Sequence, residues 1–124
     1  MSDCVWLGLL CYPGWMDNAG SFDTLAPHLA AAGIIVVAVD PPGSGKSDHL
    51  PAATMYMDSA EARTIIEVAD ALAASDDAWA EPFLLLGHSR GGGIAAVSAA
   101  GFADRIRGLV VCESGLGEFL YLQL

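Results

Sequence analysis

The sequence predicts an α/β domain, an open parallel sheet of about four strands with flanking helices on both faces. Four apolar runs lack the alternation of a half-buried strand, and segments with a helical pattern separate them. Such uninterrupted strands are typical of parallel sheets that helices cover on both sides. With 124 residues, of which 54% are apolar and 16% charged, the chain fits one domain over 1–124.

The predicted strands are apolar or β-branched runs, and the first two end at turn residues. Tyr-Pro-Gly at 12–14 ends the first run, and Asp-Pro-Pro-Gly at 40–43 ends the second. Proline and glycine favour turns over the continuation of a strand. The four strands are predicted at 5–11, 34–39, 83–86 and 108–112.

Two helices are predicted before the third strand. The first, over 21–33, begins at a serine cap and stops at a glycine. The second, over 58–73, is capped by Asp58, and Glu61 stands where a capping box has its acidic residue. The longest connection is 41–57, and loops of that length are usually functional or mobile.

A Gly-x-Ser-x-Gly motif at 87–91 follows the third apolar run and precedes an Ala-rich helical segment. This order is typical of a nucleophile elbow, a sharp turn that exposes the serine hydroxyl. Ser89 is therefore the candidate nucleophile. The N–H of Arg90 lies at the start of the helix, where the helix dipole favours a developing oxyanion. The alternative is a glycine-rich turn without chemistry.

Charge and targeting signals narrow the classes of function. Five Lys and Arg against fifteen Asp and Glu give a formal net charge of −10, which repels nucleic acid and anionic lipid. The first three residues lack the basic start of a secretory signal, and no run approaches about 18 apolar residues. We expect no nucleic-acid partner, no membrane partner, no cofactor and no metal.

The three cysteines favour a reducing compartment. Their number is odd, and Cys4 and Cys11 lie on one predicted strand, roughly 23 Å apart at about 3.3 Å per residue. That distance is too long for a disulfide. We therefore expect a cytoplasmic protein.

The segment 40–47 differs at one residue from a phosphate-binding P-loop, which needs Gly-x-x-x-x-Gly-Lys-Ser/Thr and a helix that starts at the lysine. Asp40 replaces the first glycine, and its carboxylate would repel phosphate groups. Pro51 follows Lys46 too closely for the required helix. A P-loop nucleotide binder is therefore a disfavoured alternative.

Three motifs, in order, resemble those of the α/β-hydrolase superfamily: Pro-Gly-Trp at 13–15, Asp-Pro-Pro-Gly-Ser-Gly-Lys-Ser at 40–47, and the serine motif at 87–91. The segment 14–27, which begins Gly-Trp-Met-Asp-Asn, is similar to the serine hydrolase-like subgroup. The resemblance spans nearly the whole chain and implies a partial α/β-hydrolase fold. The implied strand order is 34–39, 5–11, 83–86, 108–112.

The resemblance also implies roles for individual residues. The N–H groups of Trp15 and Arg90 would form the oxyanion hole for acyl transfer from Ser89. Pro13 stands where the family usually has histidine, which alters the oxyanion loop. Glu113 ends the fourth strand, where some members place the triad acid and others have a residue with a local hydrogen-bonding role.

The family places its catalytic histidine after the last strand, whereas this sequence ends at Leu124. We do not expect His28, His49 or His88 to replace that base. The sequence thus predicts a partial domain without the acid–histidine segment and lid, a truncated, inactive serine hydrolase of carboxylic-ester type. The intact protein would take a small-molecule ester or acyl substrate. The alternative is a non-catalytic remnant or interaction module.

The family's sheet order also implies two unpaired edges. The strands at 34–39 and 109–112 would lack their outer neighbours, and neither carries a central Lys, a Pro or an inward-pointing charge. We expect the chain to self-associate through these edges.

Overall fold

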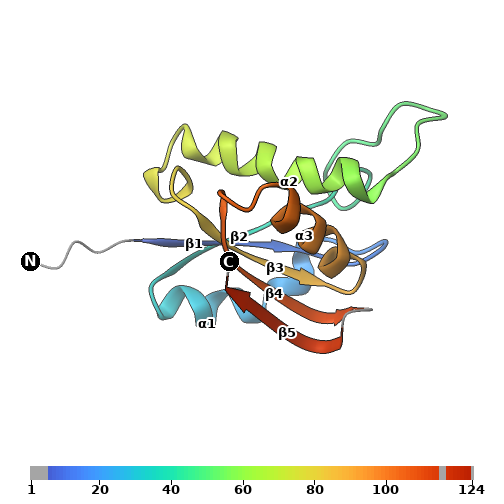
Figure 1. The fold of residues 1–124 in the computed structure, drawn as a ribbon. Helices are drawn as coiled ribbons and strands as arrows, with labels where there is room; N and C mark the ends of the chain where they lie inside the picture. Colours follow the sequence, from blue (N-terminus) through green and yellow to red (C-terminus); the bar gives the residue numbers. More distant parts are fainter. Residues whose placement is uncertain (1–5, 115–116, 124) are drawn as a thin grey trace, which may run out of the picture.

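The computed structural model describes residues 6–114 and 117–123, with side chains from Trp6 to Cys112 (Figure 1). Strands and helices alternate as far as the fourth strand. The elements are β1 (Leu7–Tyr12), η1 (Ala19–Phe22), α1 (Leu25–Ala31), β2 (Ile34–Ala38), α2 (Asp58–Ala73), η2 (Asp77–Trp79), β3 (Phe83–His88), α3 (Arg90–Gly101), β4 (Ile106–Ser114) and β5 (Gly117–Gln123), where η marks a 3-10 helix.

The strands form one sheet in the order β2-β1-β3-β4-β5 (Figure 1). The first four are parallel: Leu9 of β1 pairs with Val36 of β2 and with Leu84 of β3, and β3 pairs with β4. The predicted parallel sheet and its order are confirmed. Parallel pairing brings the carboxyl ends of these strands to one edge, where the loops with the candidate residues meet.

The fifth strand corrects the predicted edge at 109–112. β5 pairs antiparallel with β4, with Cys112 opposite Phe119 and Gly108 opposite Gln123. The end strands of the described sheet are therefore β2 and β5. The missed signal is the apolar run Phe-Leu-Tyr-Leu at 119–122.

Two predicted helix caps are wrong. The first helical segment is a 3-10 turn, η1, capped by Asn18, followed by α1, so Ser21 is not a cap. α2 begins at Asp58 itself, and its N-cap Met57 makes no side-chain hydrogen bond. Glu61 completes no capping box, because its carboxylate is bound to partners outside the helix.

The face of the sheet that α2 and α3 cover holds the larger core (Figure 1). The side chain of Trp79 is 1% exposed there, and its ring centroid lies 5.7 Å from that of Phe83. The inner side of α2 packs on this core. Other members of the core are Leu10, Ile65, Leu85, Ile94, Ile106 and Leu109.

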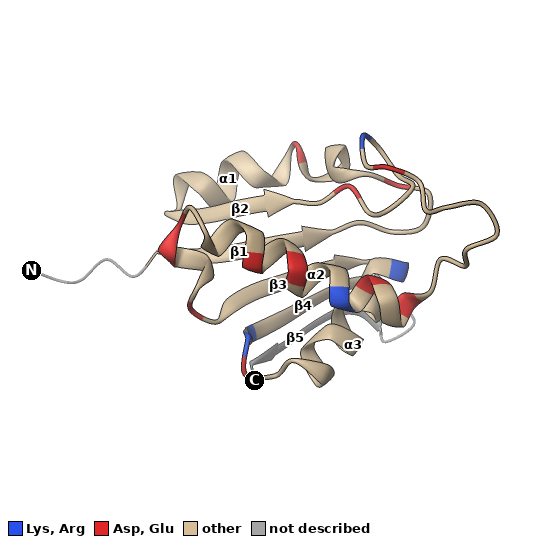
Figure 2. Ribbon diagram, turned by 90° about the horizontal axis from the view of Figure 1, so that it is seen from above, with Lys and Arg blue, Asp and Glu red and all other residues tan. Residues whose placement is uncertain are grey.

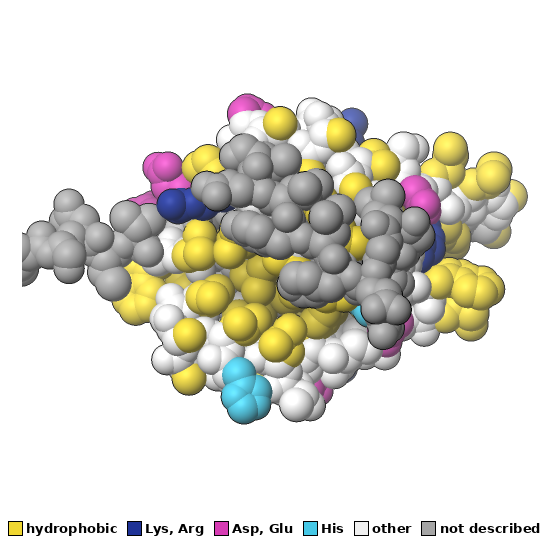
Figure 3. All heavy atoms as spheres, turned by 60° about the horizontal axis from the view of Figure 1, so that its bottom comes forward, with side chains coloured by type: hydrophobic (Ala, Val, Ile, Leu, Met, Phe, Trp, Pro, Cys, Tyr) yellow, Lys and Arg dark blue, Asp and Glu magenta, His cyan; other side chains and the backbone are white. Residues whose placement is uncertain are grey.

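The face that carries α1 is less completely covered. Its buried cluster is small, with Leu9, Cys11, Phe22 and Leu86, and α1 itself buries no residue fully. Apolar side chains gather at the surface of this face (Figure 3). Partly buried members are Ile34, Val36, Leu84 and Val110.

Acidic residues lie on α2 and on loops at both ends of the sheet (Figure 2). Three of the basic residues are paired with them. Arg63 contacts Glu67, Arg105 contacts Asp70, and Arg90 contacts carboxylates of α2. The described part of the chain contains no helix with an apolar stretch of the length that a bilayer requires.

Candidate active site

Ser89 occupies a strained turn between β3 and α3. Its φ is +55° and its ψ −124°, in a left-handed region that residues with a side chain rarely adopt. The Ser89 N–H donates to the carbonyl of Cys112 at 2.9 Å, and the N–H of Gly92 donates to the Ser89 carbonyl at 2.9 Å. These bonds hold the strained backbone, as the predicted nucleophile elbow requires.

The two glycines of the motif are required by close backbone approach. A Cβ on Gly87 would collide with the carbonyl of Gly91, and a Cβ on Gly91 would collide with the carbonyls of Pro13 and Tyr12. A backbone carbonyl cannot swing aside as a flexible side chain can. The start of α3 therefore packs directly on β3 and on the end of β1.

The loop after β1 passes directly beside Ser89. A Cβ on Gly14 would lie 3.1 Å from the Ser89 Cβ and 3.6 Å from its Oγ. Trp15 follows, with its side chain 74% exposed. Arg90 is the first residue of α3. Their oxyanion role stays a prediction.

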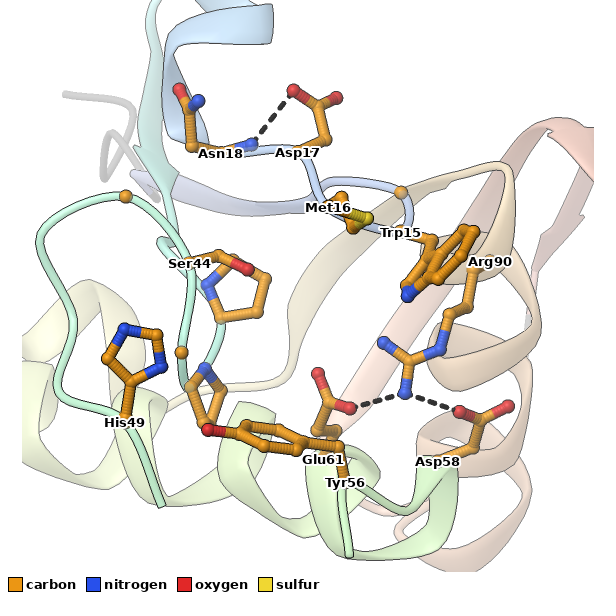
Figure 4. A pocket seen from close by; sticks show the side chains of 15 residues that line it. Trp15, Met16, Asp17, Asn18, Ser44, His49, Tyr56, Asp58, Glu61 and Arg90 are labelled. Atoms are coloured by element: carbon orange, nitrogen blue, oxygen red, sulfur yellow. Dashed lines mark hydrogen bonds and ion pairs between the residues drawn. The ribbon is translucent and has the colours of Figure 1, made fainter. Parts of the chain in front are cut away.

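A cavity of about 490 Å³ lies beside the elbow (Figure 4). Its walls are the loop 14–18 after β1, the loop 41–45 after β2, and the start of α2. His49 lies across the pocket from Arg90 (Figure 4). The other lining residues are Tyr56, Asp58 and Glu61.

A hydrogen-bonded network joins α2 to the elbow. The Glu61 carboxylate, 4% exposed, accepts a hydrogen bond from the buried Tyr12 hydroxyl at 2.7 Å and binds the Arg90 guanidinium. Asp58 accepts from the same Arg90 nitrogen at 2.6 Å (Figure 4). Burial, and then the hydrogen bond to Glu61, raise the pKa of Tyr12. The phenol therefore remains a donor at neutral pH.

The charge state of Arg90 is also secured by this network. Burial lowers its pKa, but the hydrogen bonds and charges of Glu61 and Asp58 outweigh burial and raise it. Its cation is therefore shared between two carboxylates on the pocket wall. Sequence analysis missed this pairing because it assigned Glu61 to a capping box; a carboxylate within the buried stripe of α2 was the available signal.

Asp40 organises the loop after β2. Its carboxylate accepts hydrogen bonds from the N–H of Ala19 at 2.9 Å and of Lys46 at 3.0 Å, and the Ser47 hydroxyl donates to its carbonyl at 2.7 Å. The bond from Lys46, and then that from Ala19, lower the pKa of Asp40. The loop at 43–47 turns without forming a helix, and α2 begins only at Asp58. The helix that a P-loop requires is therefore missing at Lys46.

The remaining predicted residues lie in different places. Glu113 lies in β4, but its side chain is outside the part of the chain whose side chains are described. His28 lies on α1, whereas His49 lines the pocket. His88 ends β3. Hydrogen bonds from Ser21 and then from Asn18 lower the pKa of Asp17, and the nearby His88 lowers it by a smaller amount. Between Trp6 and Cys112, no three His, Cys, Asp or Glu side chains are placed to hold a metal ion.

Known proteins share this sequence and fold. The family described as alpha/beta hydrolase fold matches residues 9–123. A serine hydrolase-like protein of Dictyostelium discoideum is 35% identical over 109 residues, which are 88% of this chain and 28% of that protein. A hypothetical protein of Pseudomonas aeruginosa PAO1 superposes with a TM-score of 0.77 at 33% identity, over 90% of this chain and 36% of that one.

A thioesterase domain from the curacin biosynthetic pathway superposes with a TM-score of 0.75 at 31% identity. The match covers 88% of this chain and 38% of that domain. The chain thus spans between 28% and 38% of the length of these three proteins.

Proposed function

Because the chain belongs to the alpha/beta hydrolase fold family, we propose that it carries the nucleophile of a serine hydrolase that cleaves carboxylic esters or related acyl substrates. The observation that carries this proposal is the backbone of Ser89, which has a positive φ between β3 and α3 and lies against the loop after β1. The thioesterase domain with the same fold supports acyl chemistry.

In the proposed reaction, the Ser89 Oγ attacks the carbonyl carbon and loses its proton to an imidazole base. As the bond from that carbon to the leaving oxygen breaks, the imidazolium gives its proton to that oxygen, and the alcohol departs. Water hydrolyses the acyl-serine by the same steps. The N–H groups of Trp15 and Arg90 donate to the oxyanion, and each such donor lowers the barrier by about 2.7–4 kcal/mol.

We assign the base to a histidine of the intact protein outside 1–124. His28 lies on α1, which covers the face of the sheet opposite α2 and α3 (Figure 1), and His49 lies across the pocket from Arg90 (Figure 4). Glu113 is the candidate triad acid, because it lies on β4, next to the strand that leads to Ser89. On this assignment the 124-residue chain is inactive by itself.

The experiment compares the 124-residue chain with the longer polypeptide that contains it, each with its Ser89→Ala variant. We expect ester turnover by the chain to equal that of its Ser89→Ala variant. A fluorophosphonate should label the longer polypeptide stoichiometrically, and Ser89→Ala should abolish the labelling. Ser89-dependent turnover at an ordinary enzymatic rate in the chain alone would contradict the external base. An unlabelled longer polypeptide would favour the non-catalytic alternative.

The pocket supports a small-molecule substrate in the intact protein. Its walls combine apolar side chains, those of Trp15, Met16 and Tyr56, with the carboxylates of Asp58 and Glu61. A cavity of about 490 Å³ is in the size range of sites for small ligands.

We propose a cytoplasmic location on the state of the Cys11 thiol. Cys11 is a free cysteine, buried in β1. Burial, and then the neighbouring Cys112, raise the pKa of Cys11 to about 12. Free thiols are typical of reducing compartments. Titration of thiols in protein purified without reductant tests this, because a disulfide would point to an oxidising compartment.

A further inference from the structure

One carboxylate of α2 contacts both segments that carry the proposed oxyanion donors. The Oε1 of Glu61 accepts a hydrogen bond from the Tyr12 hydroxyl, and its Oε2 binds the Arg90 guanidinium. Tyr12 ends β1, three residues before Trp15, and Arg90 is the other donor residue. A single side chain therefore spans the loop after β1 and the elbow after β3.

The surroundings of Glu61 make this link rigid. Its buried neighbours on α2 are apolar, namely Ala62, Ile65, Ile66 and Ala69. An ionised carboxylate in such a place needs hydrogen bonds and a counter-charge, and the loss of either partner is costly. Hydrogen bonds that involve a charged group are also stronger and shorter than neutral ones. Packing alone gives no reason for a carboxylate at this position.

We propose that Glu61 is a positioning residue, which fixes the N–H groups of Trp15 and Arg90 relative to one another by holding Tyr12 and Arg90 with its two oxygens. This inference rests on the proposed function, because an oxyanion hole is the device that needs two N–H groups in a fixed relation. Such sites tolerate errors of only about 0.5 Å.

A second pair on the same helix provides a matched control. Asp70 of α2 accepts from Arg105 at 2.7 Å, and its side chain is 58% exposed. The Asp70→Asn substitution removes a carboxylate and breaks an arginine pair, as Glu61→Gln does. The partner of Asp70, however, is Arg105, which directly precedes β4 and belongs neither to the loop after β1 nor to the elbow.

The experiment follows the backbone amides of Trp15 and Arg90 by two-dimensional ¹H–¹⁵N NMR of the 124-residue chain. The variants are Tyr12→Phe, Arg90→Met, Glu61→Gln and Asp70→Asn. Tyr12→Phe removes one hydroxyl and keeps the ring, so it is the mildest change. A role in stability alone would lower the melting temperature without moving amide resonances of the folded state.

We expect Tyr12→Phe to shift the Arg90 amide and Arg90→Met to shift the Trp15 amide, each by more than Asp70→Asn does. Glu61→Gln should shift both. In a Glu61→Leu background, Tyr12→Phe should no longer move the Arg90 amide, because the connecting carboxylate is gone. Shifts no larger than those of Asp70→Asn, or an unchanged effect of Tyr12→Phe in the Glu61→Leu background, would overturn the proposal.

The amide measurement does not depend on reactivity at Ser89. Coupled amides with an unreactive Ser89 in the longer polypeptide would support the positioning role and contradict the serine hydrolase. Uncoupled amides with a reactive Ser89 would support the serine hydrolase and contradict the positioning role. The failure of either proposal is therefore recognised separately.

Discussion

The two faces of the sheet differ in how much structure covers them. The face with α2 and α3 has a continuous core from Leu10 to Leu109, and the candidate site rests on it. The face with α1 has a small buried cluster, and apolar side chains such as Val36 are only partly buried there. We infer that the rigid geometry of the elbow depends on the core under α2 and α3, while the face with α1 is available for further contacts.

The largest expected effect compares buried aromatic residues on the two faces. Trp79→Ala should lower the free energy of unfolding by about 3–5 kcal/mol, because it empties a fully buried site in the larger core. Phe22→Ala should cost about 1–3 kcal/mol, because the thinner cluster can collapse around the gap. Urea denaturation of both variants measures the difference. Equal losses would mean that the faces are equally well packed.

A sharper contrast lies within α3, between its buried and its open side. Gly91→Ala should destabilise the chain by about 1–3 kcal/mol or more, because the added Cβ meets two backbone carbonyls. A Cβ on Gly93 would meet no atom within 4 Å, so Gly93→Ala should stabilise the helix by about 0.5–1 kcal/mol. Thermal unfolding by circular dichroism gives both values, and shifts of the same sign would contradict the packing described for Gly91.

The open face leads to a prediction about self-association. β2 is an end strand of the described sheet, and its Val36 side chain lies on the α1 face. We expect the molar mass from light scattering to rise with protein concentration, despite the net charge of −10. Val36→Lys should reduce this rise by placing a charge on the face. A monodisperse monomer at all concentrations would show that this face needs no partner.

The smallest expected effect concerns the pH dependence of stability, through the Asp40 carboxylate in the loop after β2. The pKa of Asp40 is lowered in the folded chain, so its hydrogen bonds stabilise the fold above the carboxyl's ordinary pKa. This contribution is lost as the pH falls through the lower, folded-state value. Asp40→Asn should therefore make stability less dependent on pH in the acid range. An unchanged acid denaturation curve would mean that Asp40 contributes nothing through its charge.

Local patterns were enough to predict the parallel strands and the elbow. Each strand is a short apolar run, and the turn at Ser89 requires glycines at fixed positions, so both leave a signal in the sequence. The pairing of Glu61 leaves no such signal, since its partners are 49 and 29 residues away along the chain. The capping-box pattern at Asp58 and Glu61 was misleading because tertiary contacts outweighed a local hydrogen bond.

The burial of Cys11 makes it a reporter of unfolding. Its side chain, near the C-terminal end of β1, has no exposed surface, and its pKa of about 12 leaves almost no thiolate at neutral pH. Alkylating agents react with the thiolate, so they should modify Cys11 only in molecules that open the sheet between β1 and its neighbours. The rate of iodoacetamide modification, followed by mass spectrometry, would then measure how often this sheet opens under native conditions.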